Sequence, residues 1–525
     1  MECSCVRHTD IPGTSKLFSD LIYHYDRVEG FYPYRPGDID SLVRAASFEY
    51  PESRRAALVK ALTPLNPGNS SLELLAQPGT VATVTGQQVG LFSGPAYSIY
   101  KALSAIKAAK ELSARGIPAV PVFWVATEDH DFAEVDHAWV FGADYQPVRL
   151  HLSGAEHSGS RPVGGVRIND APLDELRRAL EGLPFADDAA AIVERAYASG
   201  STMGSAFAQI VRELFAPMGL LLIDPLVPAV REIGAPLLRE AVERMPELVE
   251  ALLARNAELA ERGYHAQVLV DRNTSLTFLL EGGERLALRR SNGSYTALHH
   301  KWTAGEIAQR GVDLSPNALL RPVMQDYILP TAAYFGGPAE LAYLAQSQVL
   351  YSKLLGRQPA ALPRASFTLV DERSHKRLVR YGLTPTDLFH GERALHDRIA
   401  AKLVPERLRA RLETTKAAFA TALDLLKTDL DAFDVSLAGA LATNRRKIEY
   451  QVGKITRKTA TQIMARDEQA VRDARALNGF VFPEKHLQER LYSIVPFLAK
   501  FGPGLVDELY SAVRLECPDH QFVVV

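Results

Sequence analysis

The stretch "GTVATVTGQQVGLFSGPAYSIYKALSAIKAAKELSARGIPAVPVFWVAT", residues 79–127, predicts a β-strand, an α-helix and a second β-strand. Residues 79–86 and 117–127 are mostly apolar, as in strands that are buried on both faces of a sheet. Between them, apolar residues recur close to helical spacing, at Ile99, Leu103, Ile106 and Leu112. Pro95 suits the first turn of this helix and Gly116 suits its end. Such a βαβ unit requires a parallel sheet that is covered by helices.

Two later apolar runs predict further strands of the same core, "MGLLLID" (218–224) and "PRASFTLV" (363–370). Together with the βαβ unit they indicate an α/β fold with a Rossmann-like, doubly wound parallel core. The core is expected in three pieces, residues 1–140, 218–259 and 316–375. Two insertions are expected to separate them, at residues 141–217 and 260–315. In the second insertion, alternating segments turn at glycines like antiparallel hairpins.

The last third of the chain predicts a helical coiled-coil domain over residues 376–478. Apolar residues there step by four and three, at Leu426, Leu430, Phe433, Leu437, Leu441, Ile448, Val452 and Ile455. A break near "DAFDVSLAGA" (431–440) would fold the segment into an antiparallel hairpin, and pairing between two subunits would leave a similar pattern. Residues 479–525 regain an amphipathic helix, "HLQERLYSIVPFLAKFG", and are expected to return to the core.

The composition is that of an ordinary globular protein with several domains, since 47% of the 525 residues are apolar and 23% are charged. The net charge of −3 argues against broad binding of nucleic acid. Apolar runs of about ten residues fall short of the roughly twenty that a membrane helix needs. The first residues show no signal peptide. We therefore expect a cytoplasmic protein with neither nucleic acid nor membrane as a partner.

The chain has three cysteines, Cys3, Cys5 and Cys517. Three thiols in a chain of this length do not make a disulfide framework. Cys3 and Cys5 have CxC spacing, but no nearby residues complete a metal quartet. We therefore interpret the cysteines as structural or incidental.

The first candidate site is the loop "TGQQVGLFSGP" (85–95), between the first strand and the helix. Its glycines, Gly86, Gly90 and Gly94, allow the backbone to approach a ligand, and a helix start at Pro95 favours phosphate or carboxylate. The side chains of Gln87 and Gln88 can donate and accept hydrogen bonds there. The pattern is neither a Walker A motif nor GxGxxG, so a plain glycine-rich turn is the alternative. Lys101, one to two turns into the helix, is a candidate catalytic residue, and a solvated lysine is the common alternative.

The second candidate site follows the next strand, at Thr127, Glu128, Asp129 and His130, on the same edge of the predicted sheet. Asp129 and His130 have the chemistry to hold an ammonium group or to move a proton near neutral pH. If "DFAEVDH" is helical, His130, Glu134 and His137 share one face and could bind zinc or iron. The alternative is that the acidic residues simply complement a helix dipole.

The third candidate site is the segment 319–351. Arg321, Gln325 and Asp326 lie on a short element, and an arginine there suits a phosphate or carboxylate. The motif "GGPAE", with Gly336, Gly337 and Glu340, repeats the arrangement of a flexible turn before a helix start. Arg364, which opens the last predicted core strand, is a weaker candidate. The basic run 444–458 is interpreted as a solvated coiled-coil face, with contact to a nucleotide as the alternative.

Four of these stretches together resemble a known family: "TGQQVGLFSGPAYSIYKA", "PVFWVATEDHDFAEVDH", "LSPNALLRPVMQDYILPTAAYFGGPAELAYLAQ" and "QERLYSIVPFL". They are similar to the cysteine-adding enzymes of bacillithiol biosynthesis, the BshC family. The resemblance runs from near residue 20 to the end of the chain.

The resemblance implies a Rossmann-type core akin to nucleotidyltransferases and class I aminoacyl-tRNA synthetases, with two connecting-peptide insertions. It also implies a coiled coil that pairs subunits into a homodimer. The implied reaction joins cysteine through an amide bond to the amine of glucosaminyl-malate, giving bacillithiol. ATP would activate the carboxylate, by adenylation or by phosphorylation, so ATP or ADP is the expected cofactor and no metal is expected.

The resemblance also suggests roles for the candidate residues. Gly86, Gln87, Gln88 and the helix start at Gly94 and Pro95 would hold nucleotide phosphates. The HxGH tetrad of the related synthetases is missing, since Gly94, Pro95, Ala96 and Tyr97 stand near its place. Asp129 and His130 would contact the cysteine ammonium group and act as general base. Arg321 and the turn from Gly336 to Glu340 would hold malate carboxylates or phosphates.

Two other functions are compatible with the sequence. A metal-dependent amide hydrolase would use His130, Glu134 and His137, and would carry stoichiometric zinc or iron. A nucleotide-binding scaffold of the same pathway would bind nucleotide without turnover and would recruit partners through the coiled coil. The polar loops at the strand ends favour an enzyme, because a scaffold needs no such convergence of charge.

Overall fold

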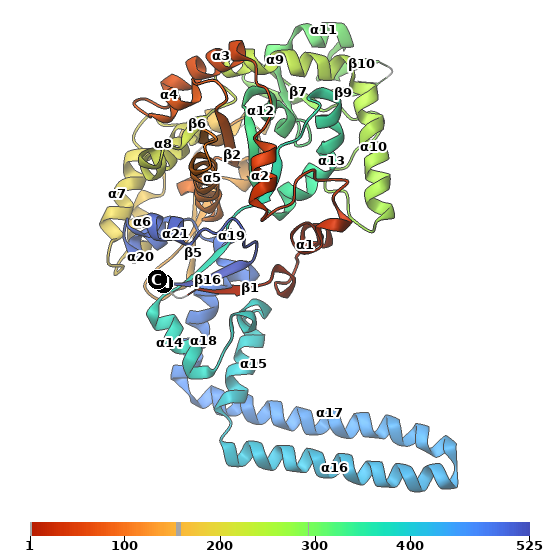
Figure 1. The fold of residues 1–525 in the computed structure, drawn as a ribbon. Coiled ribbons are helices and arrows are strands. Elements are labelled where there is room, and N and C mark those ends of the chain that lie inside the picture. Colours follow the sequence, from red (N-terminus) through yellow and green to blue (C-terminus); the bar gives the residue numbers. More distant parts are fainter. Residues whose placement is uncertain (1–2, 154–158, 292) are drawn as a thin grey trace.

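A five-stranded parallel sheet forms the centre of the computed structural model, which describes residues 3–153, 159–291 and 293–525 (Figure 1). The strand order is β14-β13-β2-β3-β6, and every neighbouring pair is parallel. The strands are β2 (Val81–Gln88), β3 (Ala119–Ala126), β6 (Leu221–Ile223), β13 (Thr331–Gly336) and β14 (Ala360–Pro363). Helix α5 (Tyr97–Ala114) connects β2 to β3, so the predicted βαβ unit and the Rossmann-like core are confirmed.

The strand order reverses beside β2. From β2 the chain continues to β3 and β6 on one side, whereas β13 and β14 lie on the other side. Gly86 is required in β2, because a Cβ atom there would lie 2.8 Å from the backbone oxygen of Trp124 on β3. In open α/β sheets, ligands bind beyond the carboxyl ends of the strands at such a reversal. The fold therefore predicts a ligand site at the carboxyl ends of β2 and β13.

The prediction of one core strand over 363–370 is wrong. That segment contributes only its first residue to β14, and β15 (Phe367–Val370) lies in a separate sheet of order β1-β16-β15. The other members of this sheet are β1 (Cys3–Val6) and β16 (His520–Val524), from the two ends of the chain. The true core strand β13 is rich in alanine and glycine, which have low strand propensity, so the apolar pattern did not reveal it.

The insertion before β6 combines a hairpin with helices. The hairpin is β4 (His137–Phe141) and β5 (Pro147–His151), and the helices are α6 (Leu173–Leu180), α7 (Ala186–Ala196) and α8 (Met203–Phe215). The insertion after β6 follows two helices, α9 (Pro228–Glu243) and α10 (Met245–Glu261).

The predicted antiparallel hairpins are present in that second insertion. Strands β7 (Thr277–Glu281) and β8 (Glu284–Ala287) turn at Gly282 and Gly283, whose φ angles of 61° and 82° are left-handed. Strand β12 (Leu314–Pro316) adds to β7. A second small sheet and a short helix complete this insertion. The sheet consists of β9 (Arg289–Ser291), β10 (Ser294–Ala297) and β11 (His300–Thr303), and the helix is α11 (Ala304–Gln309).

Further helices flank the central sheet. Those before it are α1 (Lys16–Tyr23), α2 (Ile39–Ala45), α3 (Glu52–Leu62) and α4 (Ser71–Leu75). Those around β13 are α12 (Arg321–Ile328) and α13 (Pro338–Leu354). No helix in the described parts of the chain is both long enough and apolar enough to span a bilayer.

The predicted helical hairpin is confirmed and projects away from the core (Figure 1). Its arms are α16 (Glu406–Phe433) and α17 (Val435–Arg466), which break at Asp434, where the side chain accepts a hydrogen bond from the Ser436 N–H. Part of the apolar seam stays exposed on the hairpin, since 84% of Phe433 and 57% of Ile455 are exposed, whereas Leu430, Leu441, Ile448 and Val452 are half-buried. Helices α14 (Glu372–Tyr381), α15 (Glu392–Leu403) and α18 (Glu468–Val481) connect the hairpin to the core.

The tail returns to the core as predicted, but not as one helix. It forms α19 (Gln488–Leu491), α20 (Val495–Phe501) and α21 (Leu505–Ala512) before β16. The helix breaks between α19 and α20 because the backbone there bonds to the core. The Tyr492 carbonyl accepts from the Ala96 N–H at 2.7 Å, and the Ser493 N–H donates to the Trp139 carbonyl at 2.9 Å.

A buried histidine in the β15–β16 sheet gives the fold a specific pH dependence. Ser366 and Thr368 bond the two ring nitrogens of His520, and burial lowers its pKa from 6.5 to about 3. As the pH falls, His520 takes up a proton in the unfolded chain before it does so in the folded protein. The free energy of unfolding therefore falls by about 3 kcal/mol between pH 6.5 and about pH 4 because of His520. We expect the His520→Gln variant to lose less stability over that range, measured by urea unfolding at both pH values. Equal losses in parent and variant would contradict a neutral His520.

Candidate active site

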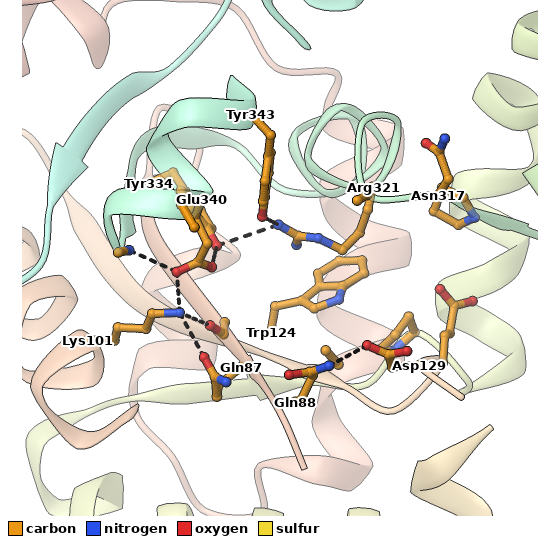
Figure 2. A pocket seen from close by; sticks show the side chains of 18 of the residues that line it. Gln87, Gln88, Lys101, Trp124, Asp129, Asn317, Arg321, Tyr334, Glu340 and Tyr343 are labelled. Atoms are coloured by element: carbon orange, nitrogen blue, oxygen red, sulfur yellow. Dashed lines mark hydrogen bonds and ion pairs between the residues drawn. The ribbon is translucent and has the colours of Figure 1, made fainter. Parts of the chain in front are cut away.

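A cavity of about 560 Å³ lies at the carboxyl ends of β2, β3 and β13, where the strand order reverses (Figure 2). This volume is typical of sites for small molecules. Val268, Phe278 and Arg285 come to its wall from the second insertion, and Arg490 comes from α19. Widely separated parts of the sequence thus build one site.

Most of the candidate residues from the sequence line this cavity. They are Gly86, Gln87, Gln88, Tyr97, Lys101, Glu128, Asp129, Arg321, Gly337, Glu340 and Arg364.

Lys101 joins the two glycine-rich turns. Its ammonium group donates to the Gly86 carbonyl at 2.9 Å and to Gln87 Oε1 at 2.8 Å, and it lies 2.5 Å from Glu340 Oε2. The Gly337 N–H and the Tyr334 hydroxyl also donate to Glu340, at 2.8 and 2.6 Å. Burial raises the pKa of the Glu340 carboxyl, but Lys101 and these donors outweigh it and hold the pKa below its ordinary value. Burial lowers the pKa of the Lys101 ammonium group, although Glu340 acts in the opposite direction. Through its three acceptors, Lys101 holds the two turns together.

Arg321 presents a positive charge without a carboxylate partner. Its guanidinium donates to Gln325 Oε1 at 3.0 Å. It also contacts the hydroxyls of Tyr343 at 3.3 Å and Tyr334 at 3.5 Å (Figure 2). These partners are neutral, and Arg321 makes no direct ion pair within the described residues. It therefore suits an incoming phosphate or carboxylate.

Asp129 is the negative group on the opposite wall. Gln88 donates to its Oδ2 at 2.6 Å, and the backbone N–H of His130 donates to its Oδ1 at 2.7 Å. Burial raises the pKa of the Asp129 carboxyl, but the Gln88 amide, the backbone N–H groups of Asp131 and His130, and Arg285 outweigh it, so the pKa lies below its ordinary value. An ionised carboxylate that faces a cavity can hold an ammonium group. Gln88 also donates to Glu134, at 2.8 Å.

The structure does not place His130 as a general base. Its Nδ1 lies 3.0 Å from an Nη atom of Arg285. A guanidinium only donates, so Nδ1 accepts this bond and a neutral ring then carries its proton on Nε2. No lone pair remains for a substrate proton in this arrangement.

The metal site that the sequence offered as an alternative does not form. Only Phe132–Glu134 makes a helical turn, of the 3-10 type, and His137 opens strand β4. The Val135 carbonyl accepts from the Leu91 N–H, which ties this segment to the first loop. His130, Glu134 and His137 therefore share no helix face, and no group of three metal-binding side chains occurs within the described residues.

Two candidate charges are held in ion pairs. Glu128 pairs with Arg231 at 2.8 Å, and Arg364 makes a two-pronged contact with Glu489, at 2.6 and 2.9 Å. Both pairs are buried. Arg364 lies between β14 and β15 rather than opening a core strand, and its bond to Glu489 fastens α19 to the core.

The cavity therefore carries excess positive charge. Lys101, Arg364 and Glu128 are neutralised by direct partners, whereas Arg285, Arg321 and Arg490 have no direct ion pair within the described residues. These three cations share the cavity with one carboxylate that has no lysine or arginine partner within the described residues, Asp129. Such a wall favours a ligand with more than one negative charge.

Comparison with known proteins identifies the family. The model described as "Bacillithiol biosynthesis BshC, N-terminal Rossmann-like domain" matches residues 1–365, and that of the BshC C-terminal coiled-coil domain matches residues 367–525. The chain belongs to the BshC family. A relative from Solibacter usitatus is 52% identical over the whole of both chains, and one from Koribacter versatilis is 36% identical over 99% of both. Both relatives carry the name "Putative cysteine ligase BshC". Membership of the BshC family identifies the chain as a ligase.

Some residues that the resemblance to BshC enzymes suggested lie outside the cavity. Gly94 and Pro95 do not line it, and the first loop is packed into the core, with Leu91 and Phe92 fully buried. The Ala96 N–H already donates to the Tyr492 carbonyl. The start of α5 is therefore not an open phosphate cradle, contrary to the prediction. The cause is the C-terminal tail, whose contact with this loop could not be read from local spacing.

The remaining outlying candidates support their neighbours. Thr127 donates to Asp224 on the far side of β3, away from the cavity. Gln325 holds Arg321, and Asp326 accepts hydrogen bonds from Gln325 and Tyr351 in the core. A Cβ atom at Gly336 would lie 3.1 Å from the Glu340 side chain, so glycine permits this tight turn.

Several residues that line the cavity of this BshC member were not predicted from the sequence: Trp124, Phe278, Arg285, Asn317, Tyr334, Tyr343 and Arg490. Tyr343 could have been found, because it follows Glu340 by three residues on a helix and so shares its face. Arg285 and Arg490 carry no local signal, because only the tertiary fold brings them to the sheet.

Proposed function

We propose that this ligase joins the carboxyl group of cysteine to the amine of glucosaminyl-malate, and that ATP first activates the carboxyl group. The observation that supports the proposal is that one cavity contains both the ionised Asp129 and the guanidinium groups of Arg321 and Arg490, which have no direct ion pair within the described residues. The two substrates and the nucleotide carry ammonium, carboxylate and phosphate groups, which these charges suit.

The chemistry divides into two steps. In the first, a carboxylate oxygen of cysteine attacks ATP and displaces pyrophosphate, giving an adenylate, or displaces ADP, giving an acyl phosphate. In the second, the acceptor amine attacks the activated carbonyl carbon, loses a proton, and expels AMP or phosphate. Activation is required because a free carboxylate is a poor acylating agent.

The residues of the cavity have distinct proposed roles. Asp129 holds an ammonium group of a substrate, oriented by Gln88. Arg321 holds a malate carboxylate or a phosphate, supported by the hydroxyl of Tyr343. Lys101 holds the Gly86 and Glu340 turns in register. Holding the reacting groups together in this way is a main source of rate enhancement.

A reconstituted assay tests the proposal. Purified protein is incubated with glucosaminyl-malate, cysteine and ATP, and mass spectrometry follows the thiol product and the nucleotide. Bacillithiol with AMP supports the adenylate, and bacillithiol with ADP supports the acyl phosphate. Amide cleavage without ATP would contradict the proposal and favour a hydrolase. Nucleotide binding by folded protein without any product would contradict it and favour a scaffold.

Asp129→Asn is expected to lower kcat/KM for the amine-bearing substrate by about tenfold to hundredfold, since a charged hydrogen bond is lost. Steady-state kinetics measure this value. Glu134→Gln is the matched control, because Glu134 shares the Gln88 amide but does not line the cavity. Full activity of Asp129→Asn would remove the second loop from the chemistry.

We also propose that the chain forms a homodimer through the hairpin of α16 and α17. The hairpin leaves apolar side chains exposed, at Phe419, Leu425, Leu426, Phe433, Tyr450 and Ile455. Exposed apolar seams of this kind normally pack against another chain.

Leu426→Glu with Ile455→Glu is expected to turn the dimer into a monomer, because two charges would be buried in the apolar seam. Size-exclusion chromatography with light scattering measures the mass. The control is Val379→Glu, on α14, where 68% of the side chain is exposed outside the hairpin. A monomeric parent protein, or a variant that remains dimeric, would contradict this assembly.

A further inference from the structure

All three cysteines of the chain meet at one small sheet, although they come from opposite ends of the sequence. Cys3 and Cys5 lie on β1, and Cys517 lies in the turn before β16. Cys5 Sγ and Cys517 Sγ are 3.9 Å apart, across a sequence separation of 512 residues. Cys5 is exposed and Cys517 is half-buried, so small molecules can reach them.

The backbone around both sulfur atoms is fixed by other contacts. Strand β1 pairs with β16 in antiparallel register, with Cys5 opposite Gln521. Two residues after Cys517, Asp519 accepts a hydrogen bond from the Tyr23 hydroxyl at 2.5 Å. The next residue, His520, is held by Ser366 and Thr368. The fold, rather than chance mobility, therefore brings the two thiols together.

We propose that Cys5 and Cys517 form a disulfide by exchange with a low-molecular-weight disulfide, and that this bond fastens the N-terminal strand to the C-terminal end of the chain.

The exchange takes two steps. The exposed Cys5 thiolate attacks one sulfur of a disulfide RSSR, forming Cys5–S–S–R and releasing RS⁻. Cys517 then attacks the Cys5 sulfur, forming the Cys5–Cys517 bond and releasing the second RS⁻. The two thiol protons leave with the two RS⁻ groups. The protein loses two electrons and RSSR is reduced to two RSH molecules.

Cys3 is not the expected partner of Cys5. Residues two apart on a strand have Cα atoms about 6.7 Å apart, longer than the usual disulfide spacing of about 5.5–6 Å. The Cys3 thiol instead donates to Gln521 Oε1 at 3.3 Å. Cys3 therefore supplies a matched control within the same strand.

The environment suits a lasting bond more than a rapid sensor. Burial raises the pKa of the Cys5 thiol and of the Cys517 thiol above the ordinary value. Few thiolates then exist at neutral pH, so exchange is slow and accelerates as the pH rises. A thiol of high pKa is also a poor leaving group, which slows reduction once the bond has formed.

Oxidation is expected to stabilise the protein, because the bond constrains nearly the whole unfolded chain. We expect the oxidised parent to unfold roughly 3 °C or more above the reduced parent, as seen by calorimetry. This comparison uses the parent chain in both states and needs no variant to fold.

The test equilibrates the full chain with oxidised and reduced glutathione, then counts free thiols and maps peptides by mass spectrometry. The parent and Cys3→Ser are expected to lose two thiols and to yield one peptide that links positions 5 and 517. Cys5→Ser and Cys517→Ser are expected to yield no internal disulfide. A Cys3–Cys5 bond, stable mixed disulfides in the parent, or no thermal shift on oxidation would overturn the proposal. Ligase activity is not the readout, so the result stands apart from the proposed reaction.

Discussion

Arg321→Gln is expected to lower kcat/KM for the proposed malate-bearing substrate by about 10²–10³-fold, while the free energy of unfolding changes by no more than about 1 kcal/mol. The activity falls because the amide cannot replace the charged, two-pronged contact of a guanidinium with a carboxylate or phosphate. Steady-state kinetics and urea unfolding measure the two quantities on the same preparation.

The stability part of this prediction follows from the partners of Arg321. They are Gln325 and the hydroxyls of Tyr334 and Tyr343, all neutral. Removing the charge forfeits its longer-range attraction to Glu340 but also removes the cost of holding a cation away from water. These two effects oppose each other. A residue kept for folding alone would instead make the variant unstable.

Tyr343→Phe is the matched control for Arg321→Gln, since it keeps the cation and removes one neutral hydroxyl. Its loss of kcat/KM is expected to be about tenfold or less. Anions add a second readout, because sulfate should raise the melting temperature of the parent more than that of Arg321→Gln. Unchanged kinetics in Arg321→Gln would assign anion binding to another cation of the cavity, with Arg490 as the next candidate.

The sequence predicted those parts of the fold that rest on local periodicity. The βαβ unit around α5 follows from two apolar runs and an amphipathic helix, and the break at Asp434 lies within residues 431–440, where the sequence predicted the hairpin to turn. Strand β13 was missed because "TAAYFG" has neither alternation nor β-branched residues beyond Thr331. Residues 363–370 were wrongly predicted as one core strand, because their apolar pattern does not reveal that the chain leaves one sheet at Pro363 and enters another at Phe367.

The candidate site was predictable where chemistry and loop position coincide. Gln87 and Gln88 end strand β2, Asp129 follows β3, and Glu340 lies in the first turn of α13. All four line the cavity as expected. His130 stands next to Asp129 in sequence, yet Arg285 from the second insertion occupies its Nδ1. The pairing of Cys5 with Cys517 also depends on long-range strand pairing. Contacts between distant segments leave no periodic signal, so sequence spacing gives no warning of them.

Lys101→Met is expected to destabilise the fold by about 3–5 kcal/mol, measured by urea unfolding near neutral pH. Only 2% of the Lys101 side chain and 22% of the Glu340 side chain are exposed. Removing the ammonium group leaves the Glu340 carboxylate without its direct ion-pair partner and the Gly86 carbonyl without that donor. Lys110→Met is the matched control, because Lys110 lies on the same helix but is exposed, and a change within about 0.5 kcal/mol is expected there.

The pH dependence of Lys101→Met distinguishes a lost charge pair from lost packing. In the parent, the pKa of Glu340 lies below its ordinary value of 4.5, so the carboxylate adds stability above that pH and loses it as the pH falls. Without Lys101, burial dominates and the pKa of Glu340 should lie above 4.5. The variant then gains stability relative to the parent as the pH falls, because the proton neutralises the buried carboxylate. Lys101→Met with Glu340→Gln should recover part of the loss at neutral pH for the same reason. A destabilisation that is constant with pH and unrelieved by Glu340→Gln would mean that Lys101 acts through its packing and not through its charge.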